Sequence, residues 1–167
     1  MNRGTAKQNA EGHGAGAALG DYDAAIRIME ALRQTLEPRG HWHSTLRNNL
    51  ASAYMNRGNA KQDAEGHGAG AALGDYDAAI RIGEALRQTL EPRGQWDPPL
   101  RNNFANACMN RCEALLAAHD PEAACRDARA ALGILDDLVS GRRGDVNPEW
   151  RQRRERAAKL LAQACAQ

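Results

Sequence analysis

Residues 75–90 read DYDAAIRIGEALRQTL, and the spacing of their apolar side chains decides the fold. These apolar positions recur every three or four residues, at Ala79, Ile82, Leu86 and Leu90. Such spacing is typical of an amphipathic helix that buries one face. Asp75 stands where an N-cap residue belongs, and residues 21–36 carry nearly the same stretch. The sequence therefore predicts two helices of one kind, over 20–37 and 74–91.

A second kind of helix follows each of these stretches. Pro92-Arg93-Gly94 is expected to end the first kind, because proline interrupts a helix and glycine suits its C-terminus. Asp97-Pro98-Pro99 then offers an N-cap followed by prolines, which a first helical turn tolerates. We therefore predict helices over 98–118 and, one unit earlier, over 44–63. Two amphipathic helices joined by a short turn cannot bury their apolar faces alone, so neighbouring pairs are expected to stack.

The chain is built on a tandem repeat of 54 residues. Residues 1–54 and 55–108 align without a gap and differ at 10 positions. A third unit begins in the same register at Met109 and then diverges. The 54-residue spacing is kept through all three units by Trp42, Trp96 and Trp150.

Two short motifs give this repeat a family resemblance. Residues 56–60 read NRGNA and residues 73–80 read LGDYDAAI, and the first unit has matching motifs at 2–6 and 19–26. Together they resemble the tetratricopeptide repeat, in which the first motif lies on helix A of a hairpin and the second leads into helix B. The resemblance, which covers roughly residues 1–140, implies a right-handed α-solenoid. It also implies that the A helices line a concave groove for a partner peptide.

The unit is longer than the family repeat of about 34 residues. Removing Asp63–Ala71 (DAEGHGAGA) restores the family spacing between the two motifs, and the third unit aligns without it. We therefore interpret Asp63–Ala71, and 9–17 in the first unit, as glycine-rich insertions between helices. The other 11 extra residues lie between Glu91 and Ala107 and lengthen helix A. Long-helix units of this kind resemble the repeats of kinesin light chains.

Composition favours helices alone. The chain of 167 residues has 33 alanines and 16 leucines, against 11 β-branched and 7 aromatic residues, which strands prefer. No stretch approaches the roughly eighteen consecutive apolar residues of a membrane span, and 22 basic residues balance 21 acidic ones. Residues 1–14, MNRGTAKQNAEGHG, lack the apolar segment of a secretory signal. We therefore expect a cytoplasmic protein with no membrane partner.

The expected organisation is a single all-α domain over 1–167, with repeat units 1–54, 55–108 and 109–140. Seven helices are predicted, near 2–9, 20–37, 44–63, 74–91, 98–118, 121–140 and 148–165. The last of these has no repeat motif and is predicted to cap the C-terminal end. Its apolar side is expected to consist of Trp150, Ala157, Ala158, Leu161, Ala164 and Cys165.

The N-terminal end is expected to be open. Met1 aligns with Met55 in the middle of a helix A, so the helix over 2–9 is only a stub. The next helix would then leave part of its apolar face bare, and a bare apolar face promotes self-association. Either further repeats precede this end, or the face pairs with a second copy of the chain through Ile26 or Ile28.

No motif for a reactive site is complete. The glycine-rich segments 12–16 and 66–70 follow a helix rather than a strand, so they are predicted to be turns rather than phosphate loops. The cysteines lack the C-x-x-C spacing of zinc sites and are predicted to be small buried thiols in a reducing cytosol. They are Cys108, Cys112, Cys125 and Cys165. No nucleophile stands beside a suitable base, and we expect no catalytic residue, metal or cofactor.

Two further patterns were weighed. His41-Trp42-His43 is replaced in the second unit by Gln95-Trp96-Asp97, so the histidines are predicted to lie on the surface and the tryptophans to pack. The basic run 142–159 offers only Trp150 for base stacking, and that residue belongs to the apolar side of its helix. Because readers of single strands interleave aromatic and basic residues, we expect no nucleic-acid partner.

A polar stripe on the A helices is the most function-like pattern. Asparagine offers both a donor and an acceptor to a peptide backbone, and it is a mediocre helix former, so its repeated use needs a reason. The predicted peptide-binding residues are Asn48, Asn49, Ser52, Asn56, Asn59, Asn102, Asn103, Asn106 and Asn110, with Glu113 at the end of the second stripe. A solvated helix face is the alternative, because duplication copies asparagine without selection.

The sequence thus predicts a non-catalytic scaffold or adaptor that binds a peptide or protein on its concave helix-A face. One alternative is a self-assembling structural module that associates through the open N-terminal face. Another is an enzyme or metal protein that uses His13, His67 or the cysteines.

Overall fold

The computed structural model describes residues 15–64, 70–141 and 147–166. In these ranges the chain forms six α-helices and two 3-10 turns, and none of the described residues lies in a strand. The all-α fold predicted from composition is confirmed. None of the described helices combines the length and apolarity needed to cross a membrane. The helix predicted over 2–9 lies outside the described residues.

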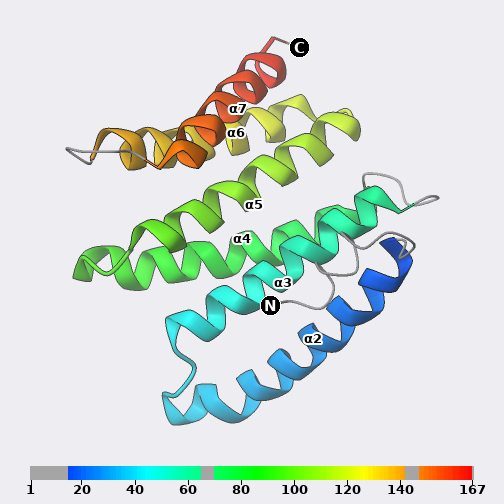
Figure 1. The fold of residues 1–167 in the computed structure, drawn as a ribbon, viewed down its shortest axis with the longest axis vertical. Helices are drawn as coiled ribbons and strands as arrows, with labels where there is room; N and C mark the ends of the chain where they lie inside the picture. Colours follow the sequence, from blue (N-terminus) through cyan, green and yellow to red (C-terminus); the bar gives the residue numbers. More distant parts are fainter. Residues whose placement is uncertain (1–14, 65–69, 142–146, 167) are drawn as a thin grey trace. The chain divides into compact units, whose positions relative to one another are not determined.

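The chain divides into two compact units, with the boundary inside helix α4 after Leu86. The first unit contains α2 (Ala15–Leu36), the 3-10 turn η1 (Glu37–Arg39), α3 (Ser44–Asp63) and most of α4 (Gly70–Leu90). The second unit contains η2 (Glu91–Arg93), α5 (Pro98–Ala117), α6 (Pro121–Ser140) and α7 (Pro148–Ala164). Within the first unit α2 and α3 pack in opposite directions, and within the second α7 contacts both members of the α5–α6 pair (Figure 1).

The predicted signals for helix ends are confirmed at the turns that lead into α3 and α5. Gly40 and Gly94 have φ angles of 70° and 66°, in the left-handed region that favours glycine. Asp97 caps α5, because its carboxylate accepts a hydrogen bond from the backbone N–H of Leu100 at 3.0 Å. Asp120 caps α6 in the same way.

The helices that carry the DYDAAI motif begin earlier than predicted. α2 begins at Ala15 and α4 at Gly70, rather than near 20 and 74. The alanine-rich stretch ahead of Asp75 has enough helix propensity to extend the helix backwards. The prediction of Asp75 as an N-cap is therefore wrong: it lies within α4 and is only 3% exposed.

The burial pattern shows how the third repeat unit aligns with the second. The third is shorter by two residues, whereas the proposed insertion would have made it shorter by nine. Six positions that are buried in α4 are also buried 52 residues later in α6. In α4 they are Ala72, Asp75, Tyr76, Ala79, Gly83 and Leu86, and in α6, in the same order, they are Ala124, Asp127, Ala128, Ala131, Leu135 and Leu138. The interpretation of Asp63–Ala71 as an insertion is thus corrected. Asp63 ends α3, and Gly70 and Ala71 open α4, so these three residues belong to the helical hairpin itself.

A close contact between neighbouring helices supports the same alignment. Tyr76 is fully buried, and a Cβ atom added to Gly58 would lie 2.6 Å from its ring. The third unit has Cys112 in place of Gly58 and Ala128 in place of Tyr76. A larger side chain on one helix is thus matched by a smaller one on the other, as volume-conserving changes in a core require.

Helix α7 packs on α5 and α6 largely through the side that was predicted to be apolar. Trp150, Ala157 and Ala164 are buried, and Leu160 is buried with them. The prediction was wrong for Ala158 and Cys165, which are exposed. The buried positions Ala157, Leu160 and Ala164 follow one another every three or four residues, and the two exposed residues lie off that line.

Two of the four cysteines are bonded to each other. Cys125 on α6 and Cys165 just after α7 form a disulfide with their Cα atoms 5.4 Å apart. The prediction of four buried thiols is wrong for this pair, because Cys165 is exposed and the packing of α7 on α6 brings together residues 40 apart in sequence. Cys108 and Cys112 are buried free thiols, as predicted. Since disulfides are rare in reducing compartments, the cysteines give no support to a cytosolic location.

The two kinds of cysteine should react differently with iodoacetamide. Burial, together with the charges of Asp127 and Glu113, raises the pKa of the Cys112 thiol to about 11, so the reactive thiolate is scarce in the folded protein near neutral pH. We expect no adduct on the native protein, two after unfolding in urea, and four after unfolding with a dithiol reductant, counted by intact mass. Four adducts without the reductant would contradict the disulfide, and two on the native protein would contradict the burial.

Candidate functional site

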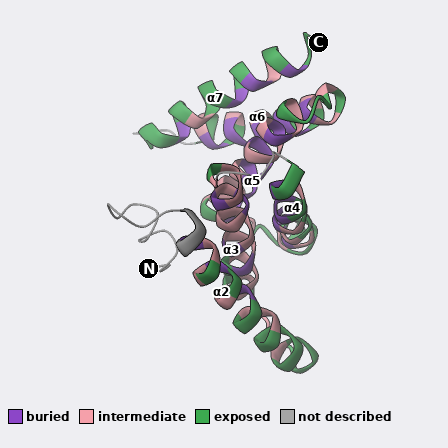
Figure 2. Cartoon of the chain, turned by 90° about the vertical axis from the view of Figure 1, so that its right-hand side faces the viewer, coloured by how far each residue is buried: buried purple, intermediate pink, exposed green. Residues whose placement is uncertain are grey.

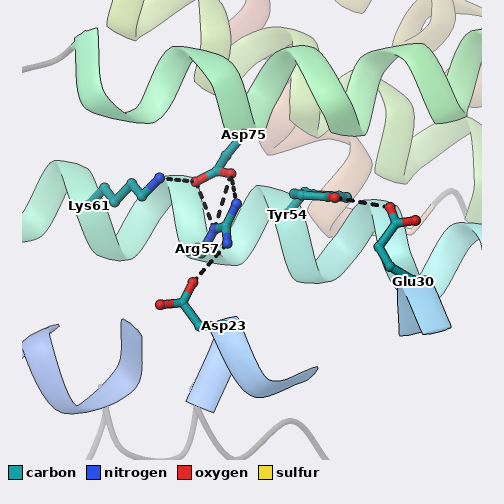
Figure 3. Close-up of polar contacts among 6 residues, drawn as sticks. All are labelled: Asp23, Glu30, Tyr54, Arg57, Lys61 and Asp75. Atoms are coloured by element: carbon teal, nitrogen blue, oxygen red, sulfur yellow. Dashed lines mark hydrogen bonds and ion pairs between the residues drawn. The ribbon is translucent and has the colours of Figure 1, made fainter. Parts of the chain in front are cut away.

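Arg57 joins three helices of the first unit at one point (Figure 3). From α3, its Nε donates to both carboxylate oxygens of Asp75 on α4 at 3.1 Å, and its Nη1 donates to Asp23 on α2 at 2.7 Å. The Nζ atom of Lys61 approaches the same buried carboxylate of Asp75 at 2.8 Å. The hydrogen bond to Asp75 is the main cause that raises the pKa of the Arg57 guanidinium above its ordinary value. This network fixes the sides of α2 and α4 that meet α3.

The same ion pair recurs in the second unit. Arg111 on α5 donates from Nε and Nη2 to the two oxygens of Asp127 on α6, both at 2.7 Å. Asp127 is 6% exposed, so this carboxylate is also buried. Arg57 of the NRG motif and Arg111, its counterpart 54 residues later, therefore each tie a helix to the next one along the chain, α3 to α4 and α5 to α6.

A groove of about 480 Å³ lies between α2, α3 and α4 within the first unit. Its apolar lining is formed by Trp42, Leu50, Tyr54 and Ile82. Leu50 is 1% exposed, whereas Trp42 and Tyr54 are half-buried and so present part of their rings to the groove. Cavities of this size are typical of ligand sites.

The acidic side chains of the groove are already engaged. The Tyr54 hydroxyl donates to Glu30 at 3.0 Å (Figure 3), and Arg33 donates to Glu37 at 3.0 Å and to Glu30 at 3.4 Å. Burial and the hydrogen bond to Glu30 raise the pKa of Tyr54, which keeps its hydroxyl protonated as a donor. Both glutamates of the groove are thus engaged in contacts within the chain.

The predicted polar stripe of α3 lies on the other side of the helix from this groove. At about 100° per residue, Asn48, Ser52 and Asn59 lie roughly half a turn from Leu50. Asn59 accepts a hydrogen bond from the Tyr76 hydroxyl at 2.8 Å, so it contacts α4.

The members of that stripe differ in how far they are engaged. Asn48 is half-buried and has a partner in the structure. Asn49 is exposed and Ser52 and Asn56 are half-buried, and these three make no hydrogen bond to any described residue. The α3 stripe is thus only partly occupied by the protein's own contacts.

On α5 the predicted stripe meets α7. Arg153 donates to Asn102 at 2.7 Å, and Arg156 donates to Asn110 at 3.2 Å and to Glu113 at 2.6 Å. Asn103 is half-buried and also engaged, whereas Asn106 is half-buried with no hydrogen bond in the described part of the chain. A peptide that used the α5 stripe would compete with the two arginines.

The other sequence candidates do not form a site. Among the described residues, no three His, Cys, Asp or Glu side chains come together as a metal site requires. His41 and His43 are exposed, as predicted, and His13 and His67 lie outside the described residues. The predicted packing of the tryptophans is confirmed: Trp42 packs on the Leu50 cluster, and Trp96 lies edge-on to Phe104 at 6.2 Å.

Sequence reasoning missed the groove because its residues come from three helices and a linker. The polar stripe was found by following one helix at a time, and that search cannot combine Arg47 of α3 with Arg81 of α4. No pattern within a single helix marks these two residues as neighbours of one cavity.

Comparison with known protein families, with curated proteins and with solved structures gives no match for this chain. Its class is therefore defined by its own fold: an all-α, helical repeat-like protein in which buried arginine–aspartate pairs join neighbouring helices.

The Arg57–Asp75 pair should be essential for the stability of the first unit. Asp75→Ala leaves Arg57 and Lys61 without their buried counter-ion, and removal of one partner of a buried pair costs about 3 kcal/mol. We expect a loss of this size in urea unfolding. Glu84→Ala, at an exposed position of the same helix, should stay within about 0.5 kcal/mol of the parent. Equal effects of the two variants would show that the pair is dispensable.

Proposed function

We propose that this chain is a non-catalytic scaffold or adaptor, built as a right-handed solenoid of tetratricopeptide-like hairpins, that binds a peptide or protein on its helix-A face. The repeated hairpin supports this architecture, because the same Arg–Asp pair joins α3 to α4 and α5 to α6. The sequence resemblance assigns α3 and α5 as A helices. It is also the source of the expectation that a partner lies along them.

One observation carries the proposed site. On α3, Asn49, Ser52 and Asn56 are at least partly exposed, and their side chains make no hydrogen bond within the described ranges. Their donors and acceptors are available to a peptide backbone, which needs both. On α5, by contrast, Arg153 and Arg156 already engage much of the stripe. We therefore assign the binding face to α3.

Replacing two of these side chains should weaken binding without changing the fold. A backbone-directed hydrogen bond contributes about 0.5–1.5 kcal/mol, so the double variant Asn49→Ala, Asn56→Ala should lose roughly tenfold or more in affinity. The measurement is fluorescence anisotropy with a peptide selected on the parent protein from a random displayed library. Asn102→Ala, on the stripe that α7 covers, serves as the control and should bind normally. If the library yields no binder, or if the control loses as much as the double variant, the assignment to α3 is wrong.

Self-assembly through the N-terminal end is the second candidate, and exposed apolar residues on α2 favour it. Ile28 is 61% exposed and Leu32 is 42% exposed, in the half of α2 that Figure 2 shows mostly in the exposed colour. Their counterparts on α4 are covered better, since Leu86 is buried and Ile82 is half-buried. Of the two isoleucines considered from the sequence, Ile26 is buried and so does not contribute to this face.

Light scattering across a concentration series tests this candidate. We expect the parent chain to show a rising average mass with concentration, because association removes Ile28 and Leu32 from water. Ile28→Lys should abolish the rise, whereas Gln34→Lys, at an exposed polar position on another side of the same helix, should keep it. A monomer at every concentration would exclude assembly through α2.

A further inference from the structure

Two arginines of the first-unit groove have no counter-ion. Arg47 on α3 is half-buried and Arg81 on α4 is exposed, and both line the groove. The side chain of neither makes a hydrogen bond or an ion pair with any described residue. Glu30 and Glu37 share the one guanidinium of Arg33, so the groove, with three arginines against two glutamates, keeps a net positive charge. A guanidinium on the wall of a partly desolvated cavity is a good site for a carboxylate.

The α5–α6 hairpin shows which group such an arginine takes. The counterpart of Arg47 in α5 is Arg101, and it pairs with Asp137 on α6 at 2.9 Å. With the 52-residue alignment of α4 and α6, the residue of α4 that corresponds to Asp137 is Ala85, which lines the groove. The α5–α6 hairpin therefore supplies its own carboxylate at a position where the first-unit groove has only a methyl group.

We propose that the groove between α2, α3 and α4 binds an acidic side chain, Asp or Glu, of a partner peptide, with its carboxylate between Arg47 and Arg81. The comparison with Asp137 identifies the missing group as a side-chain carboxylate. The partner's neighbouring apolar residue packs on Trp42 and Ile82. This site does not depend on the proposed helix-A face, because at about 100° per residue Arg47 lies roughly half a turn from Asn49 and Asn56 on α3.

The probe is a labelled, acetylated and amidated peptide that alternates Glu with Leu, and binding is measured by fluorescence anisotropy. We expect it to bind, and its twin with Gln in place of Glu to bind about tenfold more weakly or worse, because the charge-assisted hydrogen bonds are lost. Arg47→Ala and Arg81→Ala should each lose about tenfold. Arg27→Ala, at an exposed position of α2 outside the groove, is the matched control and should bind normally.

The variant Ala85→Asp gives the sharpest test. It introduces a carboxylate at the position that corresponds to Asp137, so Arg47 should pair within the chain. Binding of the Glu peptide should then be lost, while the helical content stays unchanged. Asp137→Ala in the second unit should leave binding at the first-unit groove as it was. If Ala85→Asp does not fold, Arg47→Gln, which keeps a hydrogen-bond donor without the charge, replaces it and should bind as weakly as Arg47→Ala.

Three outcomes would overturn the proposal. The first is equal binding of the Glu and Gln peptides. The second is unchanged affinity in both Arg47→Ala and Arg81→Ala. The third is tight binding of a Gln peptide whose single carboxylate is its free C-terminus, which would assign the groove to chain ends rather than acidic side chains. The double variant Asn49→Ala, Asn56→Ala should still bind the Glu peptide, and this result distinguishes the groove from the helix-A face.

Discussion

The structure depends on a buried carboxylate that meets an arginine from the preceding helix. A charge in that position is costly unless it is paired, so the sequence must supply both partners in every hairpin that uses it. Asp75 and Asp127 are such carboxylates, and their partners Arg57 and Arg111 come from equivalent positions of α3 and α5. The pair fixes the register between the two helices, because a shift of one residue along either helix would bury an unpaired charge.

That constraint explains how much of the fold could be predicted. Seven helices were expected from apolar spacing and turn residues, and the six that fall within the described residues are present. These signals are local, so they needed no knowledge of neighbours. Asp75 was misjudged for the opposite reason. An aspartate near a helix start is equally suited to cap it or to pair within it, and only Arg57, 18 residues away, decides between these roles. The Cys125–Cys165 bond was likewise beyond a local pattern, since it depends on where α7 packs.

The candidate sites differ in the same way. A stripe on one helix is visible in sequence, and the asparagines of α3 and α5 were found there. What the sequence does not reveal is that α7 reaches the α5 stripe while three members of the α3 stripe stay unengaged. The groove is harder still, because its lining is assembled from α2, α3, α4 and a linker residue. The duplication is informative once the two copies are aligned correctly. Arg101 has the carboxylate of Asp137 as its partner, whereas its counterpart Arg47 has only Ala85 at the corresponding position.

The covalent bond between Cys125 and Cys165 also changes how the molecule would respond to mechanical load. A force applied at the C-terminal end is transmitted through the disulfide to α6, so the contacts that pack α7 on its neighbours do not have to resist it. The segment between the two cysteines, which are 40 positions apart, cannot extend while the bond is intact, and this removes about 130–140 Å from the length that the unfolded chain can reach. A tether attached at this end is therefore anchored in the body of the second unit rather than in its last helix.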